Sequence, residues 1–352
     1  MPDLPPELWC TVALYLPNDT LKGLYAVNRP FFDLAMNESY REVSFRKIDE
    51  STTRQLEALS SLSGSLEHLT VSCCPPEYLS VFYKHKSLSS LTLNVASLGR
   101  QSFETSTSSG LHGFLRQQGG TLRHLEISAS VSENPWRAYR FSFHDLQLSS
   151  LQSLSVTADI LASSWDDSFA FLRNHVQLES LSIDGPLAPS EIYRILDVLN
   201  HHHPSTALVE LSLSIYNLDV RVLDKLASDL RRLRSLKLKI SKISCDTTYA
   251  ITPSQHFPDD SVSGKVYPFV NEMKLHASFE RWELKDITIK RRSCCADLLL
   301  WGLMSLCAQC IPSITSFAGN GDKMIPAGLQ LQATYKRCLQ VLCSYGTDHT
   351  LW

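Results

Sequence analysis

Leucines recur along the chain in a fixed short pattern. Two leucines separated by two positions are followed, after one further position, by a third aliphatic residue. Seven copies occur: Leu66-Leu69-Val71, Leu88-Leu91-Leu93, Leu122-Leu125-Ile127, Leu151-Leu154-Val156, Leu178-Leu181-Ile183, Leu208-Leu211-Leu213 and Leu233-Leu236-Leu238. Their first leucines lie between 22 and 34 residues apart. A repeat of this length predicts a stack of similar units along the chain.

The end of each copy has the alternation of a β-strand. Because successive side chains of a strand point to opposite sides, the apolar residues face the interior and those between them face outward. Stretches with helical spacing follow, as at Ile192, Ile195, Leu196 and Leu199, which share one helical face. The pattern resembles degenerate leucine-rich repeats, in which a strand and a returning helix form each unit. One unit cannot bury its own apolar face, so we expect stacking against neighbours to stabilise the array.

The repeat does not cover the whole chain. A degenerate eighth copy is expected at Val270-Met273-Leu275, and two polar inserts, at 99–110 and 254–265, are expected to be mobile loops. After about residue 290 the period ends, and helix-like stretches follow. We predict an α/β solenoid with three parts: an N-terminal unit of three helices at 1–45, the repeat array at 46–290 and a helical C-terminal cap at 291–352.

Composition and charge narrow the class of protein. Hydrophobic residues make up 43% of the 352 positions and charged residues 20%, which is typical of a folded globular chain. The formal net charge of −3 predicts no overall attraction to nucleic acid or to an anionic membrane. The opening residues lack a signal-peptide pattern, so we expect a cytoplasmic or nuclear protein whose ten cysteines are reduced. The apolar stretch 294–311 contains Asp297 and Gln309, which favours a buried helix over a membrane span.

The first 45 residues predict three short helices. Pro5 and Pro6 precede a helix with Leu8, Val12 and Leu16 on one face, and Pro17 ends it. A second helix carries Leu21, Leu24 and Val27, and a third begins near Pro30. So small a unit cannot bury all of these side chains within itself, so part of its surface must be covered by the array or by another protein.

The order and spacing of these residues resemble an F-box. The segment Leu4-Pro5-Pro6-Glu7-Leu8-Trp9 opens the motif, and Val27-Asn28-Arg29-Pro30-Phe31 stands where many F-boxes have Val-Cys-Arg-x-Trp. The extension to Tyr40-Arg41 is similar to the expanded F-box families of mushroom-forming fungi. The resemblance covers about the first 45 residues, and the array that follows looks like the leucine-rich substrate arm of the same class.

The resemblance implies partners for both ends of the chain. An F-box binds a Skp-type adaptor, which a cullin holds, and the remainder of the chain captures a protein for ubiquitination. Carried over, the apolar set that faces or supports the adaptor comprises Leu4, Pro5, Leu8, Val12, Leu16, Leu21, Leu24 and Val27. The sequence does not separate residues that face the adaptor from those that support them. A plain helical cap on the array is the alternative, although such a cap would not need the Leu-Pro-x-Glu-Leu opening.

No motif of a catalytic or cofactor site is present. The chain lacks a Gly-x-Ser-x-Gly elbow, a His-Glu-x-x-His pair and a phosphate-binding loop, so we expect neither an enzyme nor a cofactor. Cys307 and Cys310 have the spacing of a zinc ligand pair, but no second pair follows, which favours core thiols. The run 201–203 of three histidines has no partner ligands nearby and is interpreted as a solvated loop.

The outward positions of the strands are mostly small and polar, which suits recognition of a protein. The last clear repeat differs because Arg234, Lys237 and Lys239 gather on its strand and the approach to it. These three residues are the candidate substrate-binding positions, and a solvated edge is the equally weighted alternative.

Together these features predict a substrate-recognition subunit of a ubiquitin ligase of the Skp, cullin and F-box type. Its partners would be the adaptor, the cullin through it, and an unidentified substrate protein, with no nucleic acid and no membrane. The alternative is a leucine-rich interaction scaffold that has F-box-like helices but never joins a cullin.

Overall fold

The computed structural model describes strands of the array and helices beside them. The described residues are 5, 8–9, 11–12, 15–17, 20, 23–24, 41–45, 66–72, 88–95, 108–129, 143, 146–158, 172, 177–202, 207–243, 269, 272–291, 303–304 and 307–317. The chain divides into two compact units. The first contains Met1–Leu154 and Asp159–Ala162, and the second contains Ser155–Ala158 and Ser163–Trp352.

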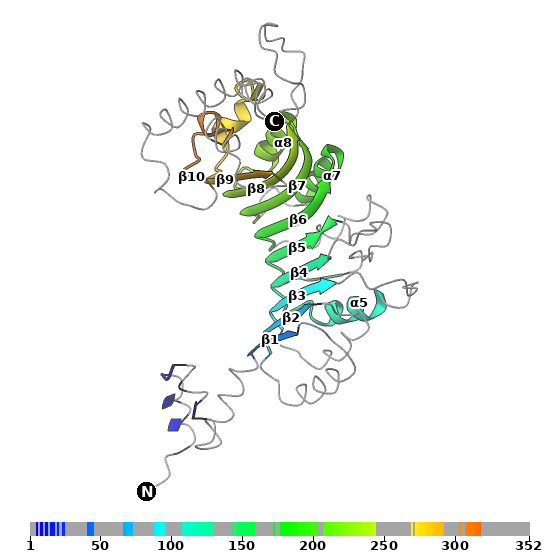
Figure 1. Cartoon of the computed structure of the whole chain (residues 1–352), viewed down its shortest axis with the longest axis vertical. Helices are drawn as coiled ribbons and strands as arrows, with labels where there is room; N and C mark the ends of the chain where they lie inside the picture. The colour runs from blue at the N-terminus through cyan, green and yellow to red at the C-terminus, as the bar shows by residue number, and fades with distance from the viewer. Residues whose placement is uncertain are drawn as a thin grey trace, which may run out of the picture. The chain divides into compact units, whose positions relative to one another are not determined.

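The first unit holds four parallel strands in sequence order (Figure 1). They are β1 (Glu42–Phe45), β2 (His68–Ser72), β3 (Ser90–Val95) and β4 (His124–Ala129). Their register aligns Val43 with Leu69, Leu91 and Leu125, so one row of apolar side chains crosses the sheet. Helix α5 (Ser108–Gln117) lies beside these strands and buries Leu111, Phe114 and Leu115. Strand β5 (Ser153–Thr157) contains the division between the units.

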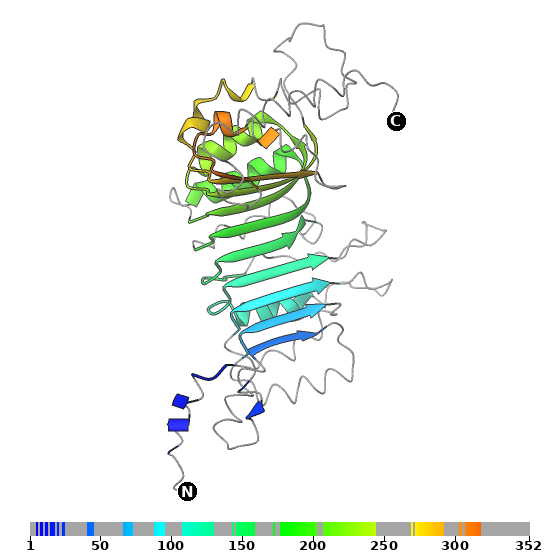
Figure 2. The same cartoon turned by 60° about the vertical axis from the view of Figure 1, so that its left-hand side comes forward.

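The second unit has a similar arrangement, in which three strands and one helix are longer (Figure 2). Its parallel strands are β6 (Ser180–Leu187), β7 (Glu210–Leu218), β8 (Ser235–Ile243), β9 (Asp286–Arg291) and β10 (Ser316–Phe317). Helices α7 (Pro189–His202) and α8 (Val220–Asp229) pack against each other beside the sheet, and α8 contacts the short 3-10 helix η5 (Ala277–Arg281). The register of Leu181, Leu211, Leu236, Ile287 and Phe317 continues one apolar row across all five strands.

The seven leucine patterns all form the predicted strands. Every one of their 21 apolar side chains is less than 5% exposed. The second and third residues of each copy face the interior by strand alternation, and the first leucine is buried just ahead of the strand. A fully buried leucine stabilises the folded chain by about 1.5–3 kcal/mol, so the repeated rows supply much of the driving force for folding. The helix expected at 190–199 is α7, and the four residues placed on its apolar face are all buried.

A repeated hydrogen-bond pattern fixes the start of each strand. The carbonyl just ahead of a strand accepts hydrogen bonds from two backbone N–H groups of the next repeat, as the Ser89 carbonyl does from Arg123 (2.8 Å) and His124 (2.9 Å). In the second unit, Arg234 accepts in the same way from Lys285 (2.8 Å) and Asp286 (2.9 Å). One carbonyl oxygen accepts both hydrogen bonds through its two lone pairs, so these backbone groups of the turn are satisfied by backbone alone. The turn sequence can therefore vary while the strands keep their register.

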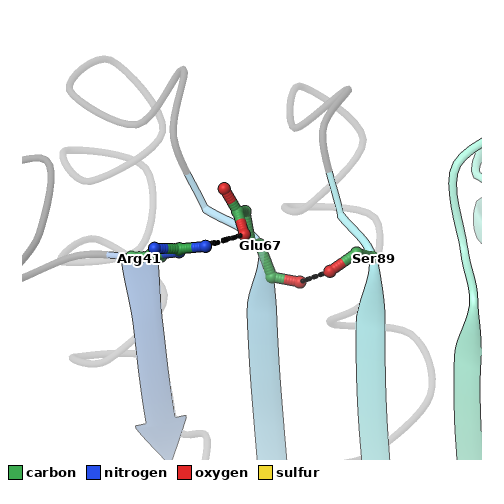
Figure 3. Close-up of polar contacts among 3 residues, drawn as sticks. All are labelled: Arg41, Glu67 and Ser89. Atoms are coloured by element: carbon green, nitrogen blue, oxygen red, sulfur yellow. Dashed lines mark hydrogen bonds and ion pairs between the residues drawn. The ribbon is translucent and has the colours of Figure 1, made fainter.

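Side chains reinforce this edge in the first unit (Figure 3). The Arg41 guanidinium reaches the Glu67 carboxylate at 2.9–3.0 Å, and the Ser89 hydroxyl donates to the Glu67 carbonyl at 3.1 Å. The ion pair is largely exposed, so its contribution to stability is small. It aligns the starts of β1 and β2.

The two long helices begin and join through named polar contacts. Asp219 caps α8 by accepting from the backbone N–H of Arg221 at 2.9 Å. Lys225 of α8 pairs with Asp229 (3.0 Å) on its own helix and with Asp197 (3.1 Å) on α7. Hydrogen bonds to Asp229 and Asp197 raise the pKa of Lys225, so this link between the helices remains charged at neutral pH.

Three strands of the sheet went unpredicted. β1 lies inside 1–45, which was assigned wholly to the helical unit, and β10 lies inside 291–352, which was assigned wholly to a helical cap. β9 takes the place of the expected eighth copy, whose Met273 is instead helical and whose Leu275 is 62% exposed. All three strands use Val, Ile or Phe at the interior positions, so a search led by leucine passes over them.

The inserts and the helical ends are partly described. Ser108–Gly110, expected within a mobile loop, forms the first turn of α5, while 99–107 and 254–265 lie outside the described residues. His201 and His202, expected in a loop, are the last residues of α7. In the expected helix 297–309, Leu303, Met304 and 307–309 are helical, and the second expected helix, 329–342, lies outside the described residues.

Candidate interaction surface

The residues between the buried leucines form a polar face on the second unit. We define the outer face by three rows of side chains. The register places Ser180, Glu210, Ser235 and Asp286 in the first row, Ser182, Ser212, Lys237 and Thr288 in the second, and Ser214, Lys239 and Lys290 in the third, with Asp184 of β6 following Ile183 beside this last row. Because the face consists of strand residues in a fixed sheet, its side chains are held at set spacings.

Basic residues gather at the far end of this face. Lys239 and Lys290 are register partners on β8 and β9, which places them on strands about 4.8 Å apart. Lys237 precedes Lys239 by two residues and therefore lies on the same side, about 6.8 Å along the strand. All three side chains are exposed. We call these three residues the lysine cluster.

Lys239 already has an acidic partner within the chain. Its Nζ lies 2.9 Å from Asp184 Oδ2, and both side chains are about half exposed. Asp184 belongs to β6 and Lys239 to β8, so the pair bridges the intervening strand β7. Ser214, the register partner of Lys239 on β7, is 1% exposed, and its Oγ has no hydrogen-bond partner among the described residues. The long lysine side chain thus crosses over a buried hydroxyl to reach the carboxylate.

The predicted basic residues do not all occupy this face. Lys237 and Lys239 lie in the lysine cluster as expected. Arg234 directly precedes β8, and its carbonyl accepts from the amides of Lys285 and Asp286 in the next repeat. Lys290 was missed because β9 itself was missed, although the alternation Ile287, Thr288, Ile289, Lys290 was available in the sequence. The cluster defined by the register therefore contains Lys290, while a role of Arg234 in binding stays a prediction.

The near end of the outer face has the opposite charge. Glu210 is exposed in the first row, and Asp286 accepts from the hydroxyl of Ser316 (2.6 Å). The face therefore changes from acidic to basic along the strands, which gives it a direction that a charged partner can recognise.

The N-terminal segment presents apolar side chains to solvent. Leu8 is 48% exposed, Val12 44% and Tyr15 85%. Leu8 and Val12 are both helical and four residues apart, which places them on one side of a helix, and Tyr15 lies in a turn where its amide donates to the Val12 carbonyl at 3.2 Å. Leu8, Trp9, Thr11 and Val12 are helical, and the amide of Leu8 donates to the carbonyl of Pro5 at 3.0 Å. Of the other predicted adaptor positions, Pro5 is exposed, Leu16 and Leu24 are half-buried, and Leu4, Leu21 and Val27 lie outside the described residues. Tyr15 was left out of the predicted set.

One cluster of residues has the composition of a hydrolytic triad but not its geometry. The hydroxyl of Ser278 donates to Asp224 Oδ1, and His276 Nδ1 lies 3.2 Å from the same oxygen. In a nucleophilic relay the histidine stands between the serine and the acid. Here both side chains contact one carboxylate oxygen, so the cluster joins α8 to the segment around η5.

The cysteine pair at 307 and 310 fits core thiols. Cys307 is fully buried beside Met273, with 3.8 Å between the sulfur atoms, and burial raises the pKa of both Cys307 and Cys310. Raised pKa values disfavour the thiolate that binds metal. In the described parts of the chain, no three His, Cys, Asp or Glu side chains are grouped as metal ligands. None of the described helices is both long enough and apolar enough to span a bilayer.

Comparisons with known proteins yield structural likenesses but no match of sequence. No protein-family model matches the chain, and no curated protein matches its sequence. Among solved structures, it is similar to a chain of the crystal structure of the Rad7 and Elc1 complex in yeast. The two are 14% identical over 92% of this chain and 88% of that chain, with a TM-score of 0.39. The α/β repeat fold of this chain therefore rests on its own strand register and burial.

Proposed function

We propose that the chain is a non-catalytic substrate-recognition subunit of a ubiquitin ligase of the Skp, cullin and F-box type. The N-terminal helices would dock on a Skp-type adaptor, the adaptor would bind a cullin, and the outer face of the array would hold the target protein in the cytoplasm or nucleus. The contribution of such a subunit to ubiquitin transfer is proximity of the target to the conjugating enzyme.

The observation that carries this proposal is the exposed apolar side formed by Leu8, Val12 and Tyr15. Soluble chains bury most large apolar side chains, so two exposed aliphatic residues on one side of a helix, with an exposed tyrosine in a turn close by, support a surface that another protein covers. These residues belong to the segment that resembles an F-box. The polar outer face, with its two zones of opposite charge, supports a second binding surface on the array.

The test is a substitution of Leu8→Asp in the full chain. A charge placed in an apolar contact cannot find a partner there, so we expect the affinity for a Skp-type adaptor to fall by at least about 2 kcal/mol, roughly thirtyfold in Kd. Titration calorimetry with purified adaptor measures this loss, and circular dichroism verifies that the array remains folded.

Leu275→Asp is the matched control. Leu275 is also an exposed leucine, at 62%, but it lies on the second unit, in the turn ahead of η5. It should leave adaptor binding unchanged. Equal adaptor affinity for the parent chain and Leu8→Asp would show that this side of the N-terminal segment does not contact the adaptor.

A further inference from the structure

The lysine cluster has more positive charge than the described residues around it neutralise. Lys239 pairs with Asp184, whereas Lys237 and Lys290 have no ion pair among the described residues. The carboxylates of Glu210 and Asp286 stand in the first row of the face, which lies four residues before Lys239 and Lys290, about 13 Å along the strands, and two residues before Lys237, about 6.8 Å. Among the described residues, Asp184 is the only acid of the outer face that forms an ion pair with a lysine of the cluster.

The contact of Asp184 shows what kind of group the cluster accepts. A carboxylate from a neighbouring strand reaches Lys239 across β7 at 2.9 Å. The contact is half exposed on both sides, so it is worth little and can exchange with a carboxylate from outside. The buried Ser214 hydroxyl beneath it is a polar group that an incoming oxygen can pair with when Lys239 moves.

We infer that the lysine cluster binds an acidic, extended segment of a partner protein, and that Asp184 competes with that segment for Lys239. Carboxylates on alternate residues of an extended peptide lie about 6.8 Å apart, which matches the spacing of Lys237 and Lys239 on one strand. A third carboxylate would reach Lys290 on the adjacent strand. This inference rests on the proposed function, because it identifies the kind of target segment that the outer face would capture.

The surrounding charges favour a short acidic peptide over a nucleic acid. A phosphate backbone carries charge continuously and needs a long basic track to neutralise it. The lysine cluster has three basic residues on two strands, and the acidic Glu210 and Asp286 lie in the first row of the same face. Those carboxylates would repel a polyanion that continued along the strands, whereas a peptide with a few acidic residues fits within the cluster.

The test measures binding of a fluorescent synthetic peptide of alternating glutamate and serine to the full chain by anisotropy, with a peptide of glutamine and serine as reference. We expect the glutamate peptide alone to bind, with an affinity that falls as salt rises. Lys237→Gln and Lys290→Gln should each weaken binding about two- to fivefold, the range expected for exposed ion pairs. Asp184→Asn should tighten binding by a similar factor, because it releases Lys239.

Lys274→Gln is the matched control, since Lys274 is an exposed lysine of the same unit away from the outer face, and it should change nothing. Equal binding of the glutamate and glutamine peptides, or an Asp184→Asn variant that binds no more tightly than the parent, would overturn the inference. The inference would also be overturned if single-stranded DNA or anionic vesicles bound more tightly than the glutamate peptide and the lysine substitutions abolished that binding. The adaptor measurement with Leu8→Asp uses other residues and another ligand, so either proposal can fail while the other stands.

Discussion

Replacing Trp282 with alanine should destabilise the second unit by about 3–5 kcal/mol. The indole is 1% exposed, packs against Phe279 with ring centroids 6.4 Å apart, and lies just ahead of β9. Removing it leaves a cavity between η5 and the sheet that the neighbouring side chains cannot fill. Urea unfolding followed by circular dichroism measures the change, and an unfolding midpoint close to that of the parent would contradict this packing.

Trp282→Phe separates packing from hydrogen bonding at the same position. The indole Nε1 donates to the carbonyl of Leu230 at 3.0 Å, but that carbonyl also accepts from the amide of Leu233 at 3.1 Å. Phenylalanine retains much of the apolar contact, and the carbonyl keeps one partner. We therefore expect a loss of about 0.5–1.5 kcal/mol for the hydrogen bond, well below the effect of alanine.

Leu236→Ala should cost about 2–5 kcal/mol, because it opens a cavity in the middle of a stacked row. Leu236 is 0% exposed and pairs in register with Leu211 on β7 and Ile287 on β9. Neighbouring repeats stabilise one another, so the loss of packing at Leu236 should also speed hydrogen exchange in β7 and β9. Amide hydrogen exchange read by mass spectrometry detects this spread.

Leu275→Ala is the control for that experiment. Leu275 is 62% exposed, so its truncation should change the free energy of unfolding by no more than about 0.5 kcal/mol. If Leu236→Ala were as mild as Leu275→Ala, the row of leucines could not be the core of the array.

The alternation of buried and outward residues made most of the array predictable. Wherever leucine occupies the first interior position, as at Leu66 or Leu233, the strand follows as expected. The leucine pattern did not predict the strands that contain Val43, Ile287 and Phe317, because branched aliphatic and aromatic side chains fill the same interior row as leucine. The physical requirement is an apolar residue of suitable volume, and this is broader than the pattern first noticed.

The candidate surface was only partly accessible from sequence. Alternation alone placed Lys237 and Lys239 on one side of a strand. Pairing of Asp184 with Lys239 depends on two strands being separated by a third, which requires the register of the sheet. Arg234 directly precedes the first residue of their strand, and its carbonyl pairs with the next repeat, a position that alternation along the strand does not define. Exposure of Leu8, Val12 and Tyr15 likewise depends on what packs against the helix, which periodicity cannot show.

The most direct measurement is assembly of the full chain with a purified Skp-type adaptor and cullin, followed by size-exclusion chromatography with light scattering. The account predicts one complex containing all three proteins in equal numbers, and its loss with Leu8→Asp but not with Leu275→Asp. A complex of chain and adaptor that never admits the cullin would instead identify an interaction scaffold outside the ligase. A chain that elutes apart from the adaptor at every concentration tested would contradict the proposed function itself.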